Sequence, residues 1–240
     1  MAAYDAFLLR YADLLQSCGL SDPERHARVV ADAYNQPHRA YHNHAHITFM
    51  LDKLDNDILN HGLELTDLER HCVKFAIWWH DYVYDPNARD NEIQSIGAWE
   101  EFVNHLSADS AVLSAYKAPV SYLIECTISH TSPASAEAEQ SLSPGLVSYF
   151  LDLDLAILAS PREVYRTYAD NIRREYIQYC LDDYRKGRAN VLRRFLERGN
   201  IFSSSAREHN LPRVEDLESR ARENIEWELS ELDSGNLPKS

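Results

Sequence analysis

The 240-residue chain lacks the features that would direct it to a membrane or a secretory pathway. No apolar stretch approaches the roughly 18 to 20 residues that a transmembrane helix needs. The amino terminus has neither the basic start nor the apolar run of a signal peptide. The four cysteines form no C-x-x-C pair, which disfavours a thiolate metal site or a disulfide framework. We therefore expect a cytoplasmic protein.

Positive charge is also scarce. The chain has 24 Lys and Arg against 38 Asp and Glu, which gives a formal net charge of -14. A nucleic-acid duplex or an anionic membrane requires a clustered basic face, whereas the basic residues between positions 173 and 194 are interleaved with acids. We expect neither as a main partner. A small anionic substrate remains compatible if a metal ion reverses the local field.

The apolar residues are spaced for helices along nearly the whole chain. With 45% hydrophobic residues the chain can bury one large core, and no segment alternates for long with the period of a strand. We predict an all-α fold with one domain over residues 1–232, including additional helices near its carboxyl end, and a disordered tail over 233–240. A homo-oligomer is compatible with this composition.

Several helix starts carry capping signals. Ser21-Asp22-Pro23-Glu24 begins one helix, and Thr66 with Glu69 forms a capping box before another. The run Ser160-Pro161-Arg162-Glu163 predicts a second capping box ahead of a long helix that continues through Tyr179. Further helices are expected over about 46–58, 90–106, 119–130, 146–159 and 214–232, and one that ends at Gly199, with a surface loop over 131–145.

The most distinctive dipeptide is His80-Asp81, which follows an aromatic run and a histidine-dense stretch over residues 41–46. An imidazole and a carboxylate side by side, with a second imidazole from upstream, are suitable ligands for a divalent metal. His46, at the start of a predicted helix, supplies that second imidazole. We therefore predict that His46, His80 and Asp81 are metal ligands.

The fourth ligand is expected from the apolar segment over residues 150–158. Asp154 lies three or four positions from apolar residues on either side, so it shares their helix face. A carboxylate on such a face is costly unless a metal or an arginine offsets its charge. Asp152 is the alternative ligand, and we prefer Asp154 because Asp152 is expected to point outward.

Two imidazoles and two carboxylates neutralise one doubly charged ion. Oxygen and nitrogen ligands without thiolate suit Mn, Mg, Fe, Co, Ni or Zn, and the sequence does not select among them. We expect one divalent metal ion, and a second ion is possible but not favoured.

In their order along the chain, His46, His80-Asp81 and Asp154 resemble the H...HD...D signature of the HD superfamily of metal-dependent phosphohydrolases. Residues 37–47, 79–85, 90–92, 127–130, 151–158 and 172–176 are similar to a largely uncharacterised subfamily of HD phosphohydrolases, and the similarity spans roughly residues 5–230. The resemblance implies an HD-type helical bundle whose metal helices converge on one pocket, and hydrolysis of a phosphoester or phosphoanhydride. It assigns no substrate.

Catalytic candidates beside the ligand set are Asp81, Glu92 and His130. Glu92, in the first turn of a helix, could orient or deprotonate a water, although an acid at a helix amino terminus is also stabilising by itself. In this family a histidine such as His130 could donate to a phosphate or bind a second ion, and it could equally be structural.

Substrate-binding candidates are Arg39, His42, Asn91 and Arg173. Arg39 and His42 precede the ligand His46, and an arginine beside a metal pocket suits bidentate phosphate binding. Arg173 could hold a phosphate or bridge nearby acids. Asn91 belongs to the Asp-Asn-Glu segment that carries part of the resemblance.

The leading functional hypothesis is a phosphohydrolase that uses a metal-activated water on a small phosphorylated substrate. Nucleotides are the favoured class because aromatic residues could stack on a base. One alternative is a non-catalytic metal- or nucleotide-binding regulatory protein. Another is an HD-type di-iron oxygenase, for which only His105 and His130 lie between His80-Asp81 and Asp154 as additional ligands.

Overall fold

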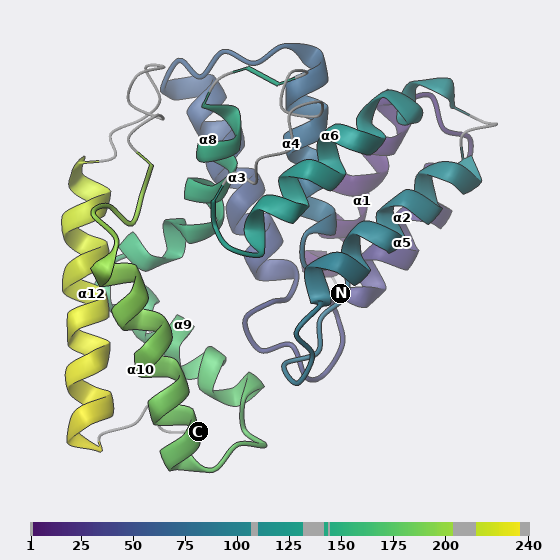
Figure 1. Ribbon diagram of the computed structural model, residues 1–240. Helices are drawn as coiled ribbons and strands as arrows, with labels where there is room; N and C mark the ends of the chain where they lie inside the picture. Colours follow the sequence, from purple (N-terminus) through teal and green to yellow (C-terminus); the bar gives the residue numbers. More distant parts are fainter. Residues whose placement is uncertain (1, 107–109, 132–141, 144, 204–214, 236–240) are drawn as a thin grey trace.

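The computed structural model describes residues 2–106, 110–131, 142–143, 145–203 and 215–235 (Figure 1). Within these ranges the secondary structure consists of α-helices and one 3-10 helix, with no strand. The prediction of an all-α fold is confirmed. None of the described helices is both long enough and apolar enough to span a membrane.

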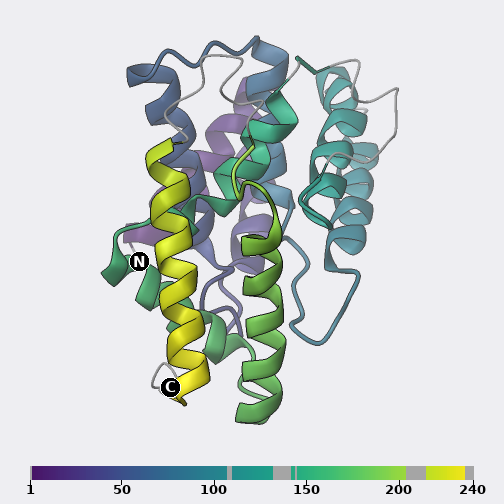
Figure 2. The same ribbon diagram turned by 60° about the vertical axis from the view of Figure 1, so that its left-hand side comes forward.

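The helices form two groups. The first contains α1 (Ala2–Ser17), α2 (Pro23–Ala33), α3 (His44–Asn60), α4 (Asp67–Trp79), α5 (Asn91–Leu106) and α6 (Ala111–Thr127). The second contains α9 (Arg162–Glu175), α10 (Leu181–Glu197) and α12 (Glu215–Ser234), and is reached through α8 (Leu146–Leu155) and the 3-10 helix η1 (Ala156–Ala159). Figures 1 and 2 both show α10 and α12 running side by side in the second group.

Each group has its own cluster of buried apolar side chains. The first cluster runs from Phe7 to Leu153 in sequence and includes Trp78, Trp79 and Trp99. The second runs from Leu155 to Leu232. Phe49 of α3 packs against both clusters. The boundary between the clusters therefore falls at the end of α8.

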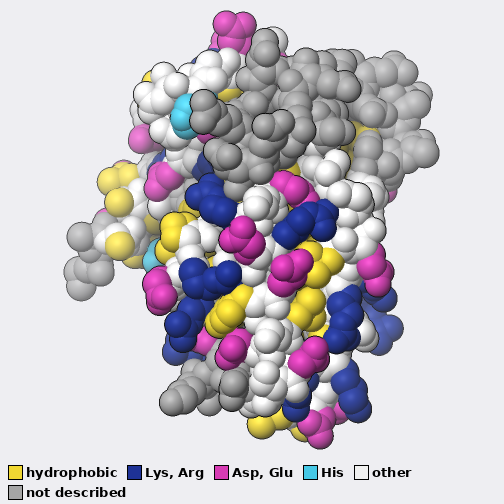
Figure 3. All heavy atoms as spheres, turned by 90° about the vertical axis from the view of Figure 1, so that its left-hand side faces the viewer, with side chains coloured by type: hydrophobic (Ala, Val, Ile, Leu, Met, Phe, Trp, Pro, Cys, Tyr) yellow, Lys and Arg dark blue, Asp and Glu magenta, His cyan; other side chains and the backbone are white. Residues whose placement is uncertain are grey.

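The face of the second group that carries α12 and α10 presents Lys and Arg side chains intermixed with Asp and Glu (Figure 3). Neither sign forms a continuous patch on this face. The acids therefore neutralise the basic residues locally on the described part of this face.

Two of the predicted helix starts are confirmed. Pro23 is the first residue of α2. At α4, the backbone N–H of Glu69 donates to Thr66 Oγ1 and the backbone N–H of Thr66 donates to Glu69 Oε2, as in a capping box. This cap fixes the start of the helix that leads to His80.

The predicted start of a helix at Pro119 is wrong. The helix α6 begins at Ala111, and Pro119 is buried inside it. Proline is favoured in the first turn of a helix because its missing N–H costs nothing there, which motivated the prediction. Here α6 packs against both α4 and α5, and this packing offsets the backbone hydrogen bond that Pro119 cannot make.

The second predicted capping box is also wrong. The residue before α9 is Pro161, and no side chain caps this helix. The helix ends at Glu175, so Tyr176 and Tyr179 lie beyond it. The helix predicted to end at Gly199 ends at Glu197. Most of the predicted loop 131–145 and of the tail 233–240 lies outside the described residues.

Candidate metal centre

His46 is oriented by the start of α3. Asn43 is the N-cap residue, and its side-chain oxygen accepts a hydrogen bond of 2.8 Å from the backbone N–H of Ala45. His46 follows in the first turn with only 4% of its surface exposed. Its Nδ1 lies 3.1 Å from the hydroxyl of Tyr41. The ring is therefore held on one side, with Nε2 directed to the other.

His80 and Asp81 follow directly after α4. The backbone N–H of His80 still donates to Ala76 O as in a helix. His80 Nδ1 lies 2.9 Å from the carbonyl oxygen of Ile77, which can only accept. The proton of the neutral ring therefore resides on Nδ1, and Nε2 presents a lone pair. That is the tautomer a metal ligand needs.

Asp154, near the end of α8, brings its carboxylate to the same point. His46 Nε2 lies 3.3 Å from His80 Nε2 and 3.3 Å from Asp154 Oδ1. His80 Nε2 lies 3.6 Å from that oxygen. Ligand atoms about 2.1 Å from one ion are about 3.0 Å apart at right angles and about 3.4 Å apart at tetrahedral angles. His46, His80 and Asp154 therefore form a group of ligand atoms that fits a metal ion.

Asp81 approaches this group from the more exposed side. Its Oδ2 lies 3.1 Å from His80 Nε2 and 3.6 Å from His46 Nε2. Its side chain is 18% exposed, close to the 17% of Asp154, whereas His46 and His80 are nearly inaccessible. The two carboxylates therefore border the accessible side of the group. Asp81 can bind a metal ion as the fourth ligand, or it can contact a group next to the ion.

The electrostatics of the group favour a cation. Burial raises the pKa of Asp154, but its contacts with His130, His46 and His80 outweigh burial and hold the pKa well below its usual value. Burial lowers the pKa of His80, but Asp81 and Asp154 outweigh it and raise the pKa well above its usual value. Two ionised acids thus attract one positive charge, supplied by a proton on His80 or by a metal ion. Metal binding here competes with protonation.

Asp152, the alternative ligand, lies elsewhere. Its Oδ1 accepts a hydrogen bond of 2.8 Å from the backbone N–H of Ser203. Its Oδ2 is buried without a hydrogen-bond partner among the described residues, and burial raises the pKa of Asp152 to about 7. The expectation that Asp152 points outward is wrong, because it faces the segment before residue 204. It does not join His46 and His80.

His130 contacts the group through Asp154. Its Nε2 lies 3.4 Å from Asp154 Oδ2, and 24% of its side chain is exposed. Its backbone is in the left-handed region, with φ of 51°, which few non-glycine residues adopt. The structure therefore brings His130 to the accessible side of the candidate centre.

Arg39 has a different role from the predicted phosphate ligand. It is 5% exposed, and its guanidinium donates to the carbonyl oxygens of His42, Asp81 and Tyr82 at 3.0, 2.7 and 2.7 Å. A guanidinium used in this way joins the segment before α3 to the segment after α4. Arg39 therefore positions Asp81 instead of presenting a free cation to a substrate.

Arg173 and Asn91 also form bonds within the protein. Arg173 donates to the carbonyl oxygens of Tyr176 and Tyr179 and is 5% exposed. The side chain of Asn91 bonds with both the backbone N–H and the carbonyl of Asp85. These contacts stabilise a turn and a loop and give neither residue a position in the metal centre. Glu92 is the second residue of α5, after Asn91, and its catalytic role stays a prediction.

His42 lies between the metal centre and the second group of helices. Its Nδ1 lies 2.7 Å from Glu175 Oε2, and its ring stacks on Tyr84 with centroids 4.3 Å apart. The other oxygen of Glu175 accepts hydrogen bonds from the backbone N–H groups of Tyr41 and His42. Glu175, at the end of α9, thus fixes the segment that precedes His46.

Glu175 is the residue that the sequence interpretation missed. It belongs to the segment 172–176, in which Arg173 is the predicted substrate-binding residue. The available signal was its position three residues after Ile172, which is buried in α9. A carboxylate on a buried face needs partners, and here they come from residues more than 130 positions away.

No protein-family model, curated protein or solved structure matches this chain in three comparisons. The side chains of the candidate centre and their order along the chain are therefore the features that bear on function.

Proposed function

We propose that this protein is a metal-dependent phosphohydrolase of the HD type that acts on a small phosphorylated metabolite, with nucleotides as the favoured class. The observation that carries the proposal is the convergence of ligand atoms of His46, His80 and Asp154, close enough together for one ion to bind, with Asp81 beside them. The order of these residues, H...HD...D, is the one that the resemblance to the HD superfamily implies.

When bound at this centre, a divalent ion supplies a Lewis acid that polarises a phosphoryl oxygen and acidifies a water. His46 and His80 contribute neutral nitrogen donors, and Asp81 and Asp154 contribute two negative charges. The charges of ion and ligands then cancel locally, which matters in a chain of net charge -14. A phosphate dianion can approach this neutral metal centre far more readily than it can approach the same two acids and two imidazoles without the ion, because those groups alone carry net negative charge.

Side chains on the accessible side are assigned the remaining roles. We assign to His130, whose Nε2 contacts Asp154, a contact with a phosphate oxygen through its other ring nitrogen. Asp81 is suited to orient the attacking water because its carboxylate is partly exposed. His42 uses Nδ1 for Glu175, which leaves Nε2 as its nitrogen available to substrate.

The test combines metal loading with a substrate screen. Purified protein is stripped of metal, reloaded separately with Mn, Mg, Fe, Co, Ni or Zn, and incubated with nucleotides, sugar phosphates and other phosphorylated metabolites while released phosphate is measured. We expect phosphate release that depends on one or more of the metals. The Asp81→Ala and His46→Gln variants should bind metal weakly and lose more than about a hundredfold of kcat/KM, since even indirect support of a metal ligand contributes up to about that factor.

His105→Gln is the matched control, because His105 lies exposed in the last turn of α5. It should retain metal binding and activity. Phosphatase activity that persists in metal-free Asp81→Ala would sink the proposal. Metal binding with no turnover of any substrate would favour a regulatory protein, and oxygen consumption by the iron-loaded protein would favour an oxygenase.

A further inference from the structure

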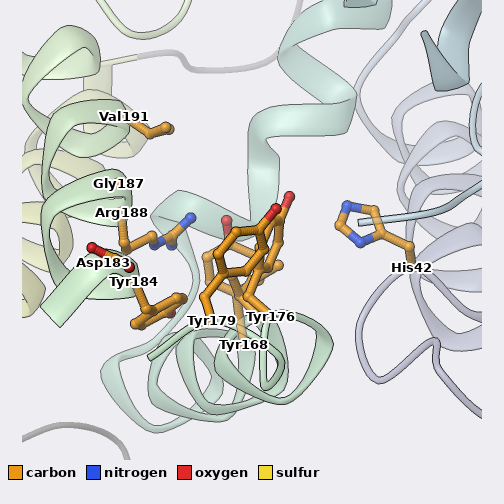
Figure 4. A pocket seen from close by; sticks show the side chains of 10 residues that line it. His42, Tyr168, Tyr176, Tyr179, Asp183, Tyr184, Gly187, Arg188 and Val191 are labelled. Atoms are coloured by element: carbon orange, nitrogen blue, oxygen red, sulfur yellow. The ribbon is translucent and has the colours of Figure 1, made fainter. Parts of the chain in front are cut away.

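A cavity of about 380 Å³ lies beside the candidate metal centre. One wall is His42, the floor is formed by tyrosines of α9 and of the turn after it, and the other wall is α10 (Figure 4). Figure 4 shows the rings of Tyr168, Tyr176 and Tyr179 grouped together between α10 and His42. The cavity therefore lies where the two groups of helices meet.

One layer of side chains separates this cavity from the metal ligands. The ring of His42 lies 6.1 Å from the ring of His46, centroid to centroid. On the other side, the ring of Tyr168 packs against Tyr41 at 4.6 Å, and the Tyr41 hydroxyl contacts His46 Nδ1. The lining residues His42 and Tyr168 are therefore neighbours of His46, directly or through Tyr41, and a group bound in the cavity lies next to the candidate centre.

The lining of the cavity is mainly aromatic. Tyr176 lies 6.0 Å from Tyr179 and 6.4 Å from Tyr184, centroid to centroid. Phenol rings offer apolar faces that pack against planar rings, and their hydroxyl groups can bond to polar atoms at a ring edge. This lining suits a flat organic group better than a chain of charged groups.

The cavity contains no uncompensated positive charge among the described lining residues. Its one lining arginine, Arg188, is bound at both Nε and Nη2 by Glu228, at 2.7 and 3.0 Å. His42 is paired with Glu175, and Asp183 adds a negative charge at the rim. An anionic group placed here would lose hydration without gaining a free cation. The group that enters is therefore uncharged.

We propose that this cavity binds an uncharged aromatic leaving group, and that the substrate is a phosphate monoester of an aromatic-ring-bearing alcohol. This inference rests on the proposed phosphohydrolase function. Water adds to phosphorus, the ester P–O bond breaks, and the departing oxygen takes a proton, so that one alcohol and one inorganic phosphate are formed. Inorganic pyrophosphate and polyphosphate chains are poor substrates because their second anionic group has no cation in the cavity.

Gly187 offers a way to fill the cavity without disturbing the fold. It lies on α10 at the cavity wall, and a Cβ added there meets no atom within 4 Å. A leucine at this position also favours the helix over glycine. Gly97 of α5 is the matched control, because it is also helical and its added Cβ also meets no atom within 4 Å.

The first measurement is binding of 2-naphthol, an uncharged aromatic probe, by calorimetry. We expect wild-type protein and Gly97→Leu to bind it alike, and Gly187→Leu to bind at least about tenfold more weakly. Tyr179→Leu, which removes one ring at a partly exposed position, should weaken binding about fivefold. Absence of binding to wild type, or unchanged binding to Gly187→Leu, would overturn the cavity assignment.

The second measurement compares kcat/KM for 1-naphthyl phosphate, glycerol phosphate and pyrophosphate with metal-loaded protein. We expect wild type and Gly97→Leu to prefer the naphthyl ester alike, and Gly187→Leu to lose this preference at least tenfold. A wild type that prefers pyrophosphate contradicts the inference. If naphthol binds but no ester is hydrolysed, the proposed phosphohydrolase function is wrong and the aromatic site stands. If glycerol phosphate is hydrolysed but naphthol does not bind, the aromatic site is wrong and the phosphohydrolase function stands.

Discussion

At the scale of single residues, the orientation of the candidate centre depends on hydrogen bonds to main-chain groups. Ile77 O fixes the tautomer of His80, and Arg39 holds the carbonyl oxygens of Asp81 and Tyr82. Glu175 accepts two N–H groups of the segment before His46. These contacts restrict the conformations of the ligand residues before a metal ion binds. Less conformational entropy is then lost on binding, which supports a preformed site.

The pair of Glu175 and His42 predicts a pH-dependent effect on stability. Burial raises the pKa of Glu175, but His42 and the backbone N–H groups outweigh it and lower the pKa. Burial lowers the pKa of His42, but Glu175 and Asp81 outweigh it and raise the pKa. The stability that ionised Glu175 contributes to the fold is fully present above about pH 4.3 and is lost as the pH falls through the pKa of Glu175 in the folded protein. The stability that protonated His42 contributes is fully present below about pH 6.5 and is lost as the pH rises through the pKa of His42 in the folded protein.

Glu175→Gln should therefore reduce the free energy of unfolding most between about pH 4.3 and 6.5. We expect a loss of about 2 kcal/mol at pH 5.5 and a smaller loss at pH 9, measured by urea unfolding. Glu163→Gln, on the same helix with a side chain 85% exposed, is the control and should change stability by less than about 0.5 kcal/mol. An equal loss at both pH values would contradict the charge-paired interpretation.

At the scale of helices, the described side chains of α10 and α12 include one buried and one exposed ion pair between the two helices. Arg188 of α10 and Glu228 of α12 are 2.7 Å apart with side chains 10% and 1% exposed. Glu228 also accepts a hydrogen bond of 2.6 Å from the Tyr165 hydroxyl of α9. Arg193 and Asp233 are 3.5 Å apart with side chains 49% and 67% exposed. The two pairs differ mainly in their exposure to solvent.

Glu228→Gln should destabilise the protein by about 3 kcal/mol, because it leaves a buried arginine without its counter-charge. Asp233→Asn, which breaks the exposed pair between the same two helices, should cost less than about 0.5 kcal/mol. Chemical unfolding followed by far-ultraviolet circular dichroism measures both. Similar losses in the two variants would show that burial does not control the strength of these contacts.

At the scale of the whole molecule, the candidate centre and the aromatic cavity lie at the junction of two packed groups of helices. His46 comes from the start of α3, His80 and Asp81 from the end of α4, and Asp154 from α8 just before the second apolar cluster begins. The cavity is completed by α9 and α10. Binding at this junction should therefore couple to the unfolding of the molecule.

A metal ion bound by residues of three separate segments should raise the unfolding temperature. At free metal one hundred times the Kd, the expected gain is about 2.7 kcal/mol, or roughly 5 to 10 °C for a chain of this size. Differential scanning fluorimetry with Mn or Co checks this. His46→Gln should abolish the rise and His105→Gln should not. A rise of equal size in His46→Gln would mean that the ion binds elsewhere.

Much of the fold and of the centre follows from local patterns. The helix-period apolar residues predict the all-α class, because a helix can bury one face only if that face repeats every three to four residues. Thr66 and Glu69 mark the start of α4 because a capping box involves only four consecutive residues. The position of Asp154 on an apolar helix face predicts it as a ligand, and it does meet His46 and His80 in the structure.

Long-range contacts decided the rest. Arg39 and Arg173 have the composition of phosphate ligands, yet their guanidinium groups hold carbonyl oxygens that the chain brings near only after folding. The same holds for Glu175, whose partners lie more than 130 residues away. Pro119 could enter α6 because packing between helices outweighed its local preference.

The sequence by itself thus determined the helical class and pointed to His46, His80 and Asp154 of the candidate metal centre, since both depend on residue type and near-neighbour spacing. Only the tertiary structure decided which charged groups are neutralised and which surfaces face a common cavity. Burial and pairing are properties of segments distant in sequence, and local periodicity carries no information about which of them will meet.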